Sequence, residues 1–191
     1  FRSQDGIYNQ KYRYPPEMII SHSFFVKDPE EFYRFYRDRM VYPEARPNEA
    51  HRVLARLEEL GKLRAVITQN IDGLHQAAGS HNVLELHGSI LRNHCMHCGK
   101  SFDLDHIMAS DGVPRCDSCG GMIKPDVVLY EEALDMGVMQ RAARYISEAD
   151  LLIVGGTSLI VYPAAGMIDY YRGDKLVLIN RDATRRDDAA D

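Results

Sequence analysis

Two closely spaced pairs of cysteines are the residues of this sequence whose spacing predicts chemistry most directly. They are the only cysteines among the 191 residues, and seventeen residues separate the pair Cys95/Cys98 from the pair Cys116/Cys119. Two Cys-x-x-Cys pairs at this distance predict a zinc ion bound by four thiolates. Two disulfides are the alternative, but nothing else in the sequence suggests an oxidising compartment. Because the protein would fill all four coordination positions, the zinc would be structural and catalysis would lie elsewhere.

Polar, glycine-containing segments follow two hydrophobic runs that are predicted to be strands. The first comprises residues 68–75 and carries Gln69, Asn70 and Asp72; the second comprises residues 155–158. In parallel sheets, ligands bind at the carboxyl ends of strands, where these segments lie. Glycines permit close approach of a ligand, and N–H groups and hydroxyls can bind a ribose or phosphate. For the first segment, a turn followed by a helix cap is an equally good interpretation.

A histidine next to a glycine, His87-Gly88, precedes the segment that carries the cysteines. A single histidine is more often structural or exposed than catalytic. Its reference pKa of about 6.5 nevertheless makes it the natural general base at neutral pH. Asn180 ends a third predicted strand, where its side chain could bind a nucleotide ribose.

Short runs rich in valine, isoleucine and leucine predict buried strands at residues 63–68, 151–154 and 175–179. Helical patterns lie between them, and helix starts are predicted at Asp28-Pro29 and at Asn48. Continuous apolar strands that alternate with helices predict an α/β fold, with a parallel sheet covered by helices on both faces. Residues 93–124 have the hydrophobic period of neither element and are predicted to form an inserted ribbon.

Charge and composition narrow the possible function classes. A formal net charge of −5 argues against sequence-independent nucleic-acid binding. The longest apolar stretch, residues 151–166, is interrupted by glycines and a proline and is too short to span a membrane. No signal peptide opens the sequence, so we expect a cytoplasmic protein with reduced cysteines. The sequence starts at Phe1 without a methionine, which suggests a missing N-terminal segment.

Together these segments resemble the sirtuins, the NAD-dependent protein lysine deacylases. The matching motifs occur in the family's order and cover essentially the whole chain: Thr68-Gln69-Asn70-Ile71-Asp72-Gly73-Leu74-His75, Leu86-His87-Gly88, the four cysteines, Gly156-Thr157-Ser158-Leu159 and Leu178-Ile179-Asn180. Two further matches are Phe1-Arg2-Ser3, at the end of the family's cofactor-binding loop, and Pro47-Asn48 with His51. The resemblance implies a Rossmann-like domain and a small zinc-ribbon and helical domain, with NAD and acyl-lysine meeting between them.

The resemblance also implies a division of the chain. Residues 1–12 would be a remnant of the cofactor loop, residues 13–43 the helical part of the small domain, and residues 93–124 the zinc ribbon. Residues 44–92 and 125–191 would form the Rossmann-like NAD-binding domain. We expect a monomer that binds acyl-lysine proteins or peptides, and neither nucleic acid nor membranes.

The chemistry that the resemblance implies centres on His87. The acyl oxygen of the substrate attacks C1′ of the nicotinamide ribose and expels nicotinamide. His87 then helps to deprotonate a ribose hydroxyl, and the reaction leads to O-acyl-ADP-ribose.

The resemblance assigns further residues to three parts of the binding site. The nicotinamide and its ribose would be bound by Gln69, Asn70 and Asp72. The adenosine side would be bound by Gly156, Thr157, Ser158 and Asn180, and Arg2 would belong to the cofactor loop. The strand that pairs with the peptide would contain Val127 and Val128, and Tyr130 would form a wall of the acyl-lysine tunnel.

The sequence departs from the family pattern at both of its ends and at one internal motif. The family's glycine-rich phosphate loop and first strand should precede Phe1; without them we expect poor NAD binding, an inactive fragment and an empty central position in the sheet. The family's last helix should follow Asp191. The family's usual Phe-Gly-Glu is replaced by Tyr130-Glu131-Glu132, which places a side chain and a negative charge near the peptide.

An acetyl-lysine deacetylase is the preferred interpretation. A desuccinylase or demalonylase is an alternative, because in that branch of the family a Tyr and an Arg three residues apart bind the acyl carboxylate, and Tyr36 and Arg39 have this spacing. Tyr36 also falls on an apolar stripe with Phe32, which indicates packing instead. The same fold could also transfer ADP-ribose to a protein, or the chain could be an inactive zinc-bearing interaction domain.

Overall fold

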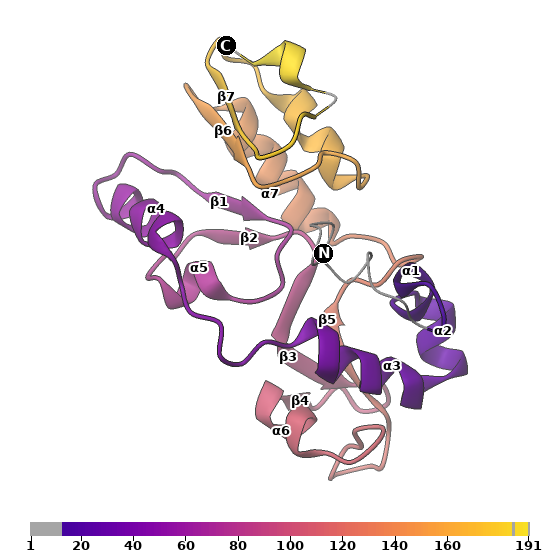
Figure 1. Cartoon of the computed structure of the whole chain (residues 1–191). Coiled ribbons are helices and arrows are strands. Elements are labelled where there is room, and N and C mark those ends of the chain that lie inside the picture. The colour runs from indigo at the N-terminus through magenta and orange to yellow at the C-terminus, as the bar shows by residue number, and fades with distance from the viewer. Residues whose placement is uncertain (1–12, 185, 191) are drawn as a thin grey trace.

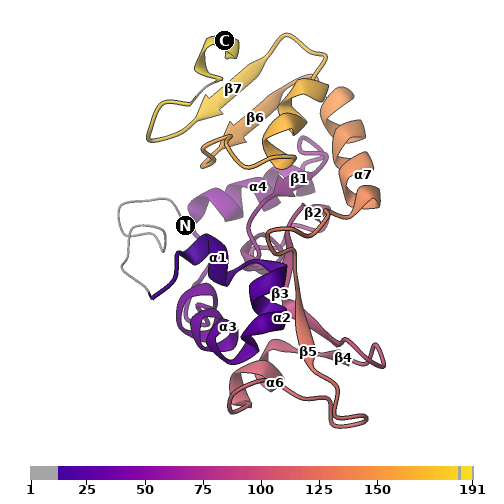
Figure 2. The same ribbon diagram turned by 90° about the vertical axis from the view of Figure 1, so that its right-hand side faces the viewer.

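The computed structural model describes residues 13–184 and 186–190 of the chain (Figure 1). Figures 1 and 2 show three groups of strands along the molecule. The pair β6–β7 lies at one end, β4 and helix α6 lie at the other, and the pair β1–β2 lies between them. Within the described residues, no helix has the length and apolar character needed to cross a membrane.

Short helices form the N-terminal part of the described chain: α1 (Pro16–Ile19), α2 (His22–Lys27), α3 (Pro29–Phe35) and the π-helical turn η2 (Tyr36–Met40). The predicted helix start at Asp28-Pro29 is confirmed, because the Asp28 carboxylate accepts a hydrogen bond from the N–H of Glu31. Ser21 caps α2 in the same way through the N–H of Phe24.

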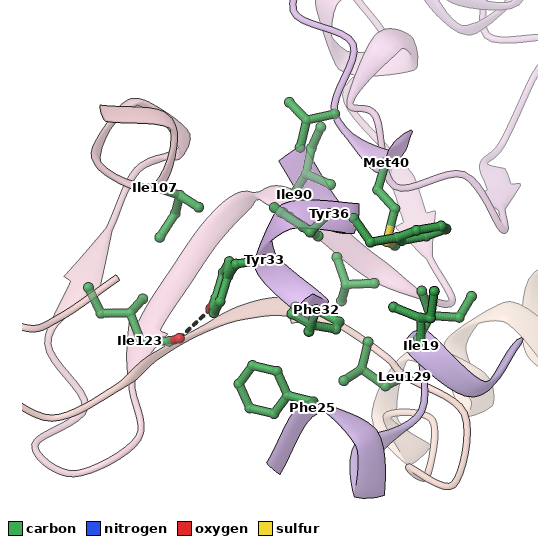
Figure 3. Close-up of a cluster of buried hydrophobic side chains, with 14 of the residues drawn as sticks. Ile19, Phe25, Phe32, Tyr33, Tyr36, Met40, Ile90, Ile107, Ile123 and Leu129 are labelled. Atoms are coloured by element: carbon green, nitrogen blue, oxygen red, sulfur yellow. Dashed lines mark hydrogen bonds between the residues drawn. The ribbon is translucent and has the colours of Figure 1, made fainter. Parts of the chain in front are cut away.

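The aromatic side chains of these helices pack on a three-stranded antiparallel sheet (Figure 3). This sheet has the order β4-β3-β5 and consists of β3 (Gly88–Cys95), β4 (Ser101–Phe102) and β5 (Ile123–Val127), with helix α6 (Leu104–Ala109) beside it. Phe25, Phe32, Tyr33 and Tyr36 are fully buried, and the Tyr33 hydroxyl donates a hydrogen bond to the carbonyl of Ile123. The helices and the cysteine-bearing strands therefore share one core.

The parallel strands form two separate pairs. One pair joins β1 (Val66–Thr68) to β2 (Val83–Glu85), and the other joins β6 (Leu152–Gly155) to β7 (Leu176–Ile179). All three predicted strands occur, whereas β2 was not predicted. β1 begins later than residue 63 because the backbone N–H groups of Lys62 and Leu63 bond to the carbonyl of Leu57 and close the preceding helix.

Helices around these pairs complete the α/β part: α4 (Glu49–Glu59), α5 (Leu74–Ala77), α7 (Met136–Ser147), and the 3₁₀ helices η3 (Ala164–Tyr170) and η4 (Asp187–Ala189). Helix α4 begins at Asn48 as predicted, and Asn48 and His51 form a reciprocal capping box. A second core packs α7 and η3 against β2. One face of the β6–β7 sheet is exposed within the described residues, and Ile153, Val177 and Ile179 lie on it. The sequence had predicted that helices would cover both faces.

The predicted ribbon is built from parts of β3 and β5 together with β4 and α6. β3 and β5 both continue across the expected boundaries of the ribbon at residues 93 and 124. The division into domains therefore stays a prediction.

Candidate functional site

His87 lies between β2 and β3, where three segments of the chain meet. Its Nδ1 is 3.1 Å from the carbonyl oxygen of Gln69, and its own carbonyl accepts a hydrogen bond of 3.0 Å from the N–H of Val128. Gly88 makes this approach of β3 and β5 possible. Its φ is +73°, and a Cβ at this position would lie 1.7 Å from the carbonyl oxygen of Asp126.

The surroundings of His87 favour the neutral imidazole. Burial lowers the pKa of His87, and the hydrogen bond to the Gln69 carbonyl opposes this effect only in part. A carbonyl oxygen can only accept, so Nδ1 carries the proton and Nε2 keeps a lone pair. The geometry therefore leaves Nε2 of His87 with a lone pair that can accept a proton.

The loop after β1 connects His87 to the second parallel pair. The side-chain amide of Gln69 donates to the hydroxyl of Thr157 at 3.2 Å, and the side-chain amide of Asn180 donates to the carbonyl of Thr157 at 2.6 Å. The candidates His87, Gln69, Thr157 and Asn180 thus form a continuous hydrogen-bonded series. Gly156 has a φ of +63°, so the backbone can turn at this point without strain.

Asn70, Asp72 and Ser158 lie in the same two loops. Asp72 accepts a hydrogen bond of 3.0 Å from the N–H of Leu74, which is the turn role, whereas the N-cap position of α5 is held by Gly73. Asn70 is exposed, and its N–H bonds to the Thr68 hydroxyl at 3.0 Å. The structural interpretation of this segment is thus correct for Asp72, whose second oxygen still leaves it able to bind a ligand.

The residues expected to contact substrate lie directly after β5 or at its end. Val127 is buried and pairs with Gly88, and the N–H of Val128 bonds to His87. Tyr130 is half-buried; its N–H bonds to Ile20, at the end of α1. This segment therefore runs from His87 to the N-terminal helices.

The four cysteines converge at one end of the three-stranded sheet. Their sulfur atoms all lie within 4.8 Å of one another, which is consistent with a structural zinc site. The sulfur atoms are 3.4 Å apart for Cys95 and Cys119 and 3.6 Å apart for Cys98 and Cys116, too long for disulfides.

Backbone groups around the sulfur atoms fit a metal-bound thiolate. The N–H groups of Cys98 and His97 point to the sulfur of Cys95 and lower the pKa of this thiol to about 6. At Gly121, a Cβ would approach the Cys95 sulfur to 2.8 Å, so glycine leaves room for the cluster. Tetrahedral zinc is the ion that such a donor set prefers.

The sequence did not predict the residues that connect the segment around Tyr130 to α2 through hydrogen bonds. His22 and Ser23 contact the two glutamates that follow Tyr130. Their only signal in the sequence was the replacement of the family's Gly by Glu131. Arg2, which was also predicted to bind the cofactor, lies outside the described residues.

Comparisons with known proteins agree with this arrangement. The sequence model of the Sir2 family matches residues 1–163. The chain is 59% identical over 194 residues to the NAD-dependent protein deacetylase of Clostridium acetobutylicum, in a match that covers 100% of this chain and 79% of the relative. Its identity to the enzyme of the same name from Clostridium perfringens is 58%, over 100% of this chain and 80% of the relative.

Solved structures of similar proteins have the same fold. A mutant Sir2 homologue in complex with ADP-ribose has a TM-score of 0.90 at 41% identity, covering 100% of this chain and 77% of that chain. A Sir2 structure with a p53 peptide and NAD⁺ has a TM-score of 0.85 at 43% identity, covering 95% of this chain and 78% of that chain. The family model, the relatives and these structures agree, and the chain belongs to the Sir2 family.

Proposed function

We propose that the protein is an NAD-dependent protein lysine deacetylase that releases nicotinamide and forms O-acetyl-ADP-ribose. The observation that carries the proposal is the position of His87, a half-buried neutral imidazole next to the segment 127–130 and hydrogen-bonded to the Gln69 loop. Relatives named NAD-dependent protein deacetylase support the same activity.

His87 has a defined task in this proposal. Its Nε2 accepts a proton from a ribose hydroxyl, while Nδ1–H stays bonded to the Gln69 carbonyl and fixes the orientation of the ring. NAD, as cosubstrate, supplies the electrophilic ribose carbon. The segment around Val127 and Val128 presents the peptide next to His87.

Residues of two loops would bind the cosubstrate. We assign Gln69, Asn70 and Asp72 to the nicotinamide ribose side, and Gly156, Thr157, Ser158 and Asn180 to the adenosine side. The hydrogen bonds of Thr157 to Gln69 and Asn180 support this assignment, because they hold the two loops at one edge of the strands.

The surroundings of Tyr36 favour acetyl over acidic acyl groups. The Tyr36 ring is fully buried and stacks on Phe32 with centroids 5.8 Å apart, and burial raises the pKa of its hydroxyl. Arg39 pairs with Asp38 at 2.6 Å. Tyr36 thus belongs to the core, and the pair Tyr36/Arg39 gives the succinyl alternative little support.

The test is the identity of the products. An acetyl-lysine peptide incubated with the full-length protein and NAD should yield nicotinamide, deacetylated peptide and O-acetyl-ADP-ribose by mass spectrometry. A gain of ADP-ribose on the peptide or protein would indicate the transferase alternative. No consumption of NAD would indicate a binding domain. Comparing kcat/KM for acetyl and succinyl forms of one peptide tests the acyl preference.

The same proposal includes the cellular compartment and the oligomeric state of the enzyme. It is a cytoplasmic monomer in this proposal, and the four thiols, which are clustered as for a metal and not paired as disulfides, support a reducing compartment. Light scattering of the purified protein would test the monomer, and the location of a tagged protein would test the compartment.

A further inference from the structure

Tyr130 is held against helix α2 by a row of hydrogen bonds that we call the Glu131 seam. Backbone bonds run from the N–H of Tyr130 to Ile20 at 3.0 Å and from the N–H of His22 to the carbonyl of Tyr130 at 2.9 Å. The Glu131 carboxylate then accepts from both the N–H and the hydroxyl of Ser23, at 2.9 Å and 3.0 Å. The seam therefore joins the expected substrate segment to the N-terminal helices at consecutive residues.

Glu132, the next residue, adds further contacts between this segment and helix α2. Its carboxylate accepts from Nδ1 of His22 at 2.8 Å, from the N–H of Leu129 at 2.8 Å, and pairs with the Lys124 ammonium at 3.1 Å. Burial opposes its ionisation, but the Leu129, His22 and Lys124 contacts together lower the pKa of Glu132 below its ordinary value. Glu132 is thus ionised at neutral pH, and its contacts stabilise the conformation of the segment that follows β5.

Glu131 occupies a backbone position that suits glycine. Its φ is +75°, in the left-handed region that residues other than glycine rarely adopt. A non-glycine residue there costs conformational energy, so its carboxylate contacts must offset that cost if the residue is to be tolerated. The Glu131 carboxylate makes two hydrogen bonds to Ser23, and a glycine could make neither of them.

We propose that Glu131 is a positioning residue for the acyl-lysine substrate, because its bonds to Ser23 hold Tyr130 and the segment 127–130 in place; this inference rests on the proposed function. The other end of the segment is already fixed, since the N–H of Val128 bonds to His87. With both ends held, the segment is a preorganised edge for the substrate peptide, which reduces the ordering cost of binding.

The test is a series of substitutions at one position. Glu131→Ala keeps the strained φ and removes the bonds, Glu131→Gly removes both, and Glu131→Gln keeps an oxygen that can accept from Ser23. We expect the KM for an acetyl-lysine peptide to rise about three- to tenfold in the Ala and Gly variants. The KM for NAD and kcat at saturating peptide should change less than about twofold, and Gln should restore the peptide KM.

Three controls make the series decisive. Ser23→Ala combined with Glu131→Ala should add little to Glu131→Ala alone, because without the carboxylate the Ser23 hydroxyl has no bond to Glu131 left to lose. Glu148→Ala, an exposed carboxylate at the end of α7, should leave the peptide KM unchanged. Amide hydrogen exchange at Tyr130 should accelerate in Glu131→Ala but not in Glu131→Gln.

An unchanged peptide KM in Glu131→Gly, or equal effects of Gln and Ala, would overturn the role of these hydrogen bonds. The affinity for acetylated peptide, measured by calorimetry, separates this result from a failure of the proposed function. If the unsubstituted protein binds the peptide without deacetylating it, the activity is wrong, and the Kd values of the series still decide the role of Glu131. If it binds no peptide at all, both proposals are wrong.

Discussion

At the scale of single residues, the proposed reaction assigns the general base to His87. Replacing His87 by Ala should reduce deacetylation kcat/KM by about 10²- to 10⁴-fold, because the general base is lost. Nicotinamide release should fall less, since the base acts after that bond has broken. Chromatography of both products would measure the two effects. Exposed His81 serves as a control, and equal activity of His87→Ala and the unsubstituted protein would exclude the assigned role.

The pH dependence follows from the burial of His87. Only the neutral imidazole accepts a proton, and burial lowers the pKa of His87 below its ordinary value of 6.5. The base form therefore persists to lower pH, and the acid limb of kcat/KM should have its midpoint below 6.5. A pH profile of kcat/KM, together with an NMR titration of the ring, would measure this. An acid limb centred above 6.5 would contradict the neutral, half-buried imidazole.

Gly88 is the residue that sets the distance between β3 and β5. Gly88→Ala should destabilise the protein by roughly 2–5 kcal/mol, from the positive φ and from the clash with the Asp126 carbonyl. Urea unfolding would measure the loss. Gly112→Ala is the matched control, because Gly112 also has a positive φ, of +63°, but nothing lies within 4 Å of its Cβ position. Equal losses of stability in both variants would mean that the clash with the Asp126 carbonyl contributes nothing.

At the scale of elements, the cysteine cluster and the N-terminal helices depend on each other. Purified protein should contain about one zinc per chain, and Cys95→Ala should unfold the ribbon, because metal affinity at such a site is folding energy. Cys95 and Cys116 lie in the same core as Phe32 and Tyr33, so the loss should extend to α3.

Elemental analysis and near-ultraviolet circular dichroism of the buried tyrosines, with and without a chelator, would test this dependence. Lys100→Ala, which removes an exposed ion pair with Asp117, is the control and should retain the metal. Soluble, reduced protein without zinc would contradict the assignment.

The elements differ in how far they could be predicted. Helix starts at Asp28 and Asn48 were predictable, because capping depends on residues three positions apart. β3 was not, because buried Ser89 and Asn93 and a register shift between them remove any period of two. β5 contains Pro125, which argues against a strand in any local interpretation. These strands exist because of pairing partners distant in the sequence.

At the scale of the whole molecule, tertiary contacts decide what the sequence pattern could not. The apolar runs predicted one parallel sheet, but the four parallel strands form two pairs that are hydrogen-bonded only within each pair among the described residues. The cysteine cluster was predictable from spacing alone. The meeting of Gln69 with Thr157 was not, because the two residues are 88 positions apart and only the family resemblance brought them into one site.

Helix α7 is the element that holds the two parallel pairs together. It packs on β2 and on η3, and its fully buried Ala142 lies in the core that contains Leu84, Leu86 and Met167. Ala142→Leu would overpack this contact and should lower the free energy of unfolding by about 1–3 kcal/mol. Thermal unfolding would measure this as a decrease of several degrees in Tm, and exposed Gln140→Leu on the same helix is the control.

The same substitution should also affect binding in a selective way. Pushing α7 away from β2 would separate the Gln69 loop from Thr157, whose side chains are 3.2 Å apart. We therefore expect the KM for NAD to rise more than the KM for the acetyl-lysine peptide, since the peptide segment is held by β3, β5 and α2 instead. A lower Tm with both KM values unchanged would show that α7 stabilises the fold without setting the distance between the two loops.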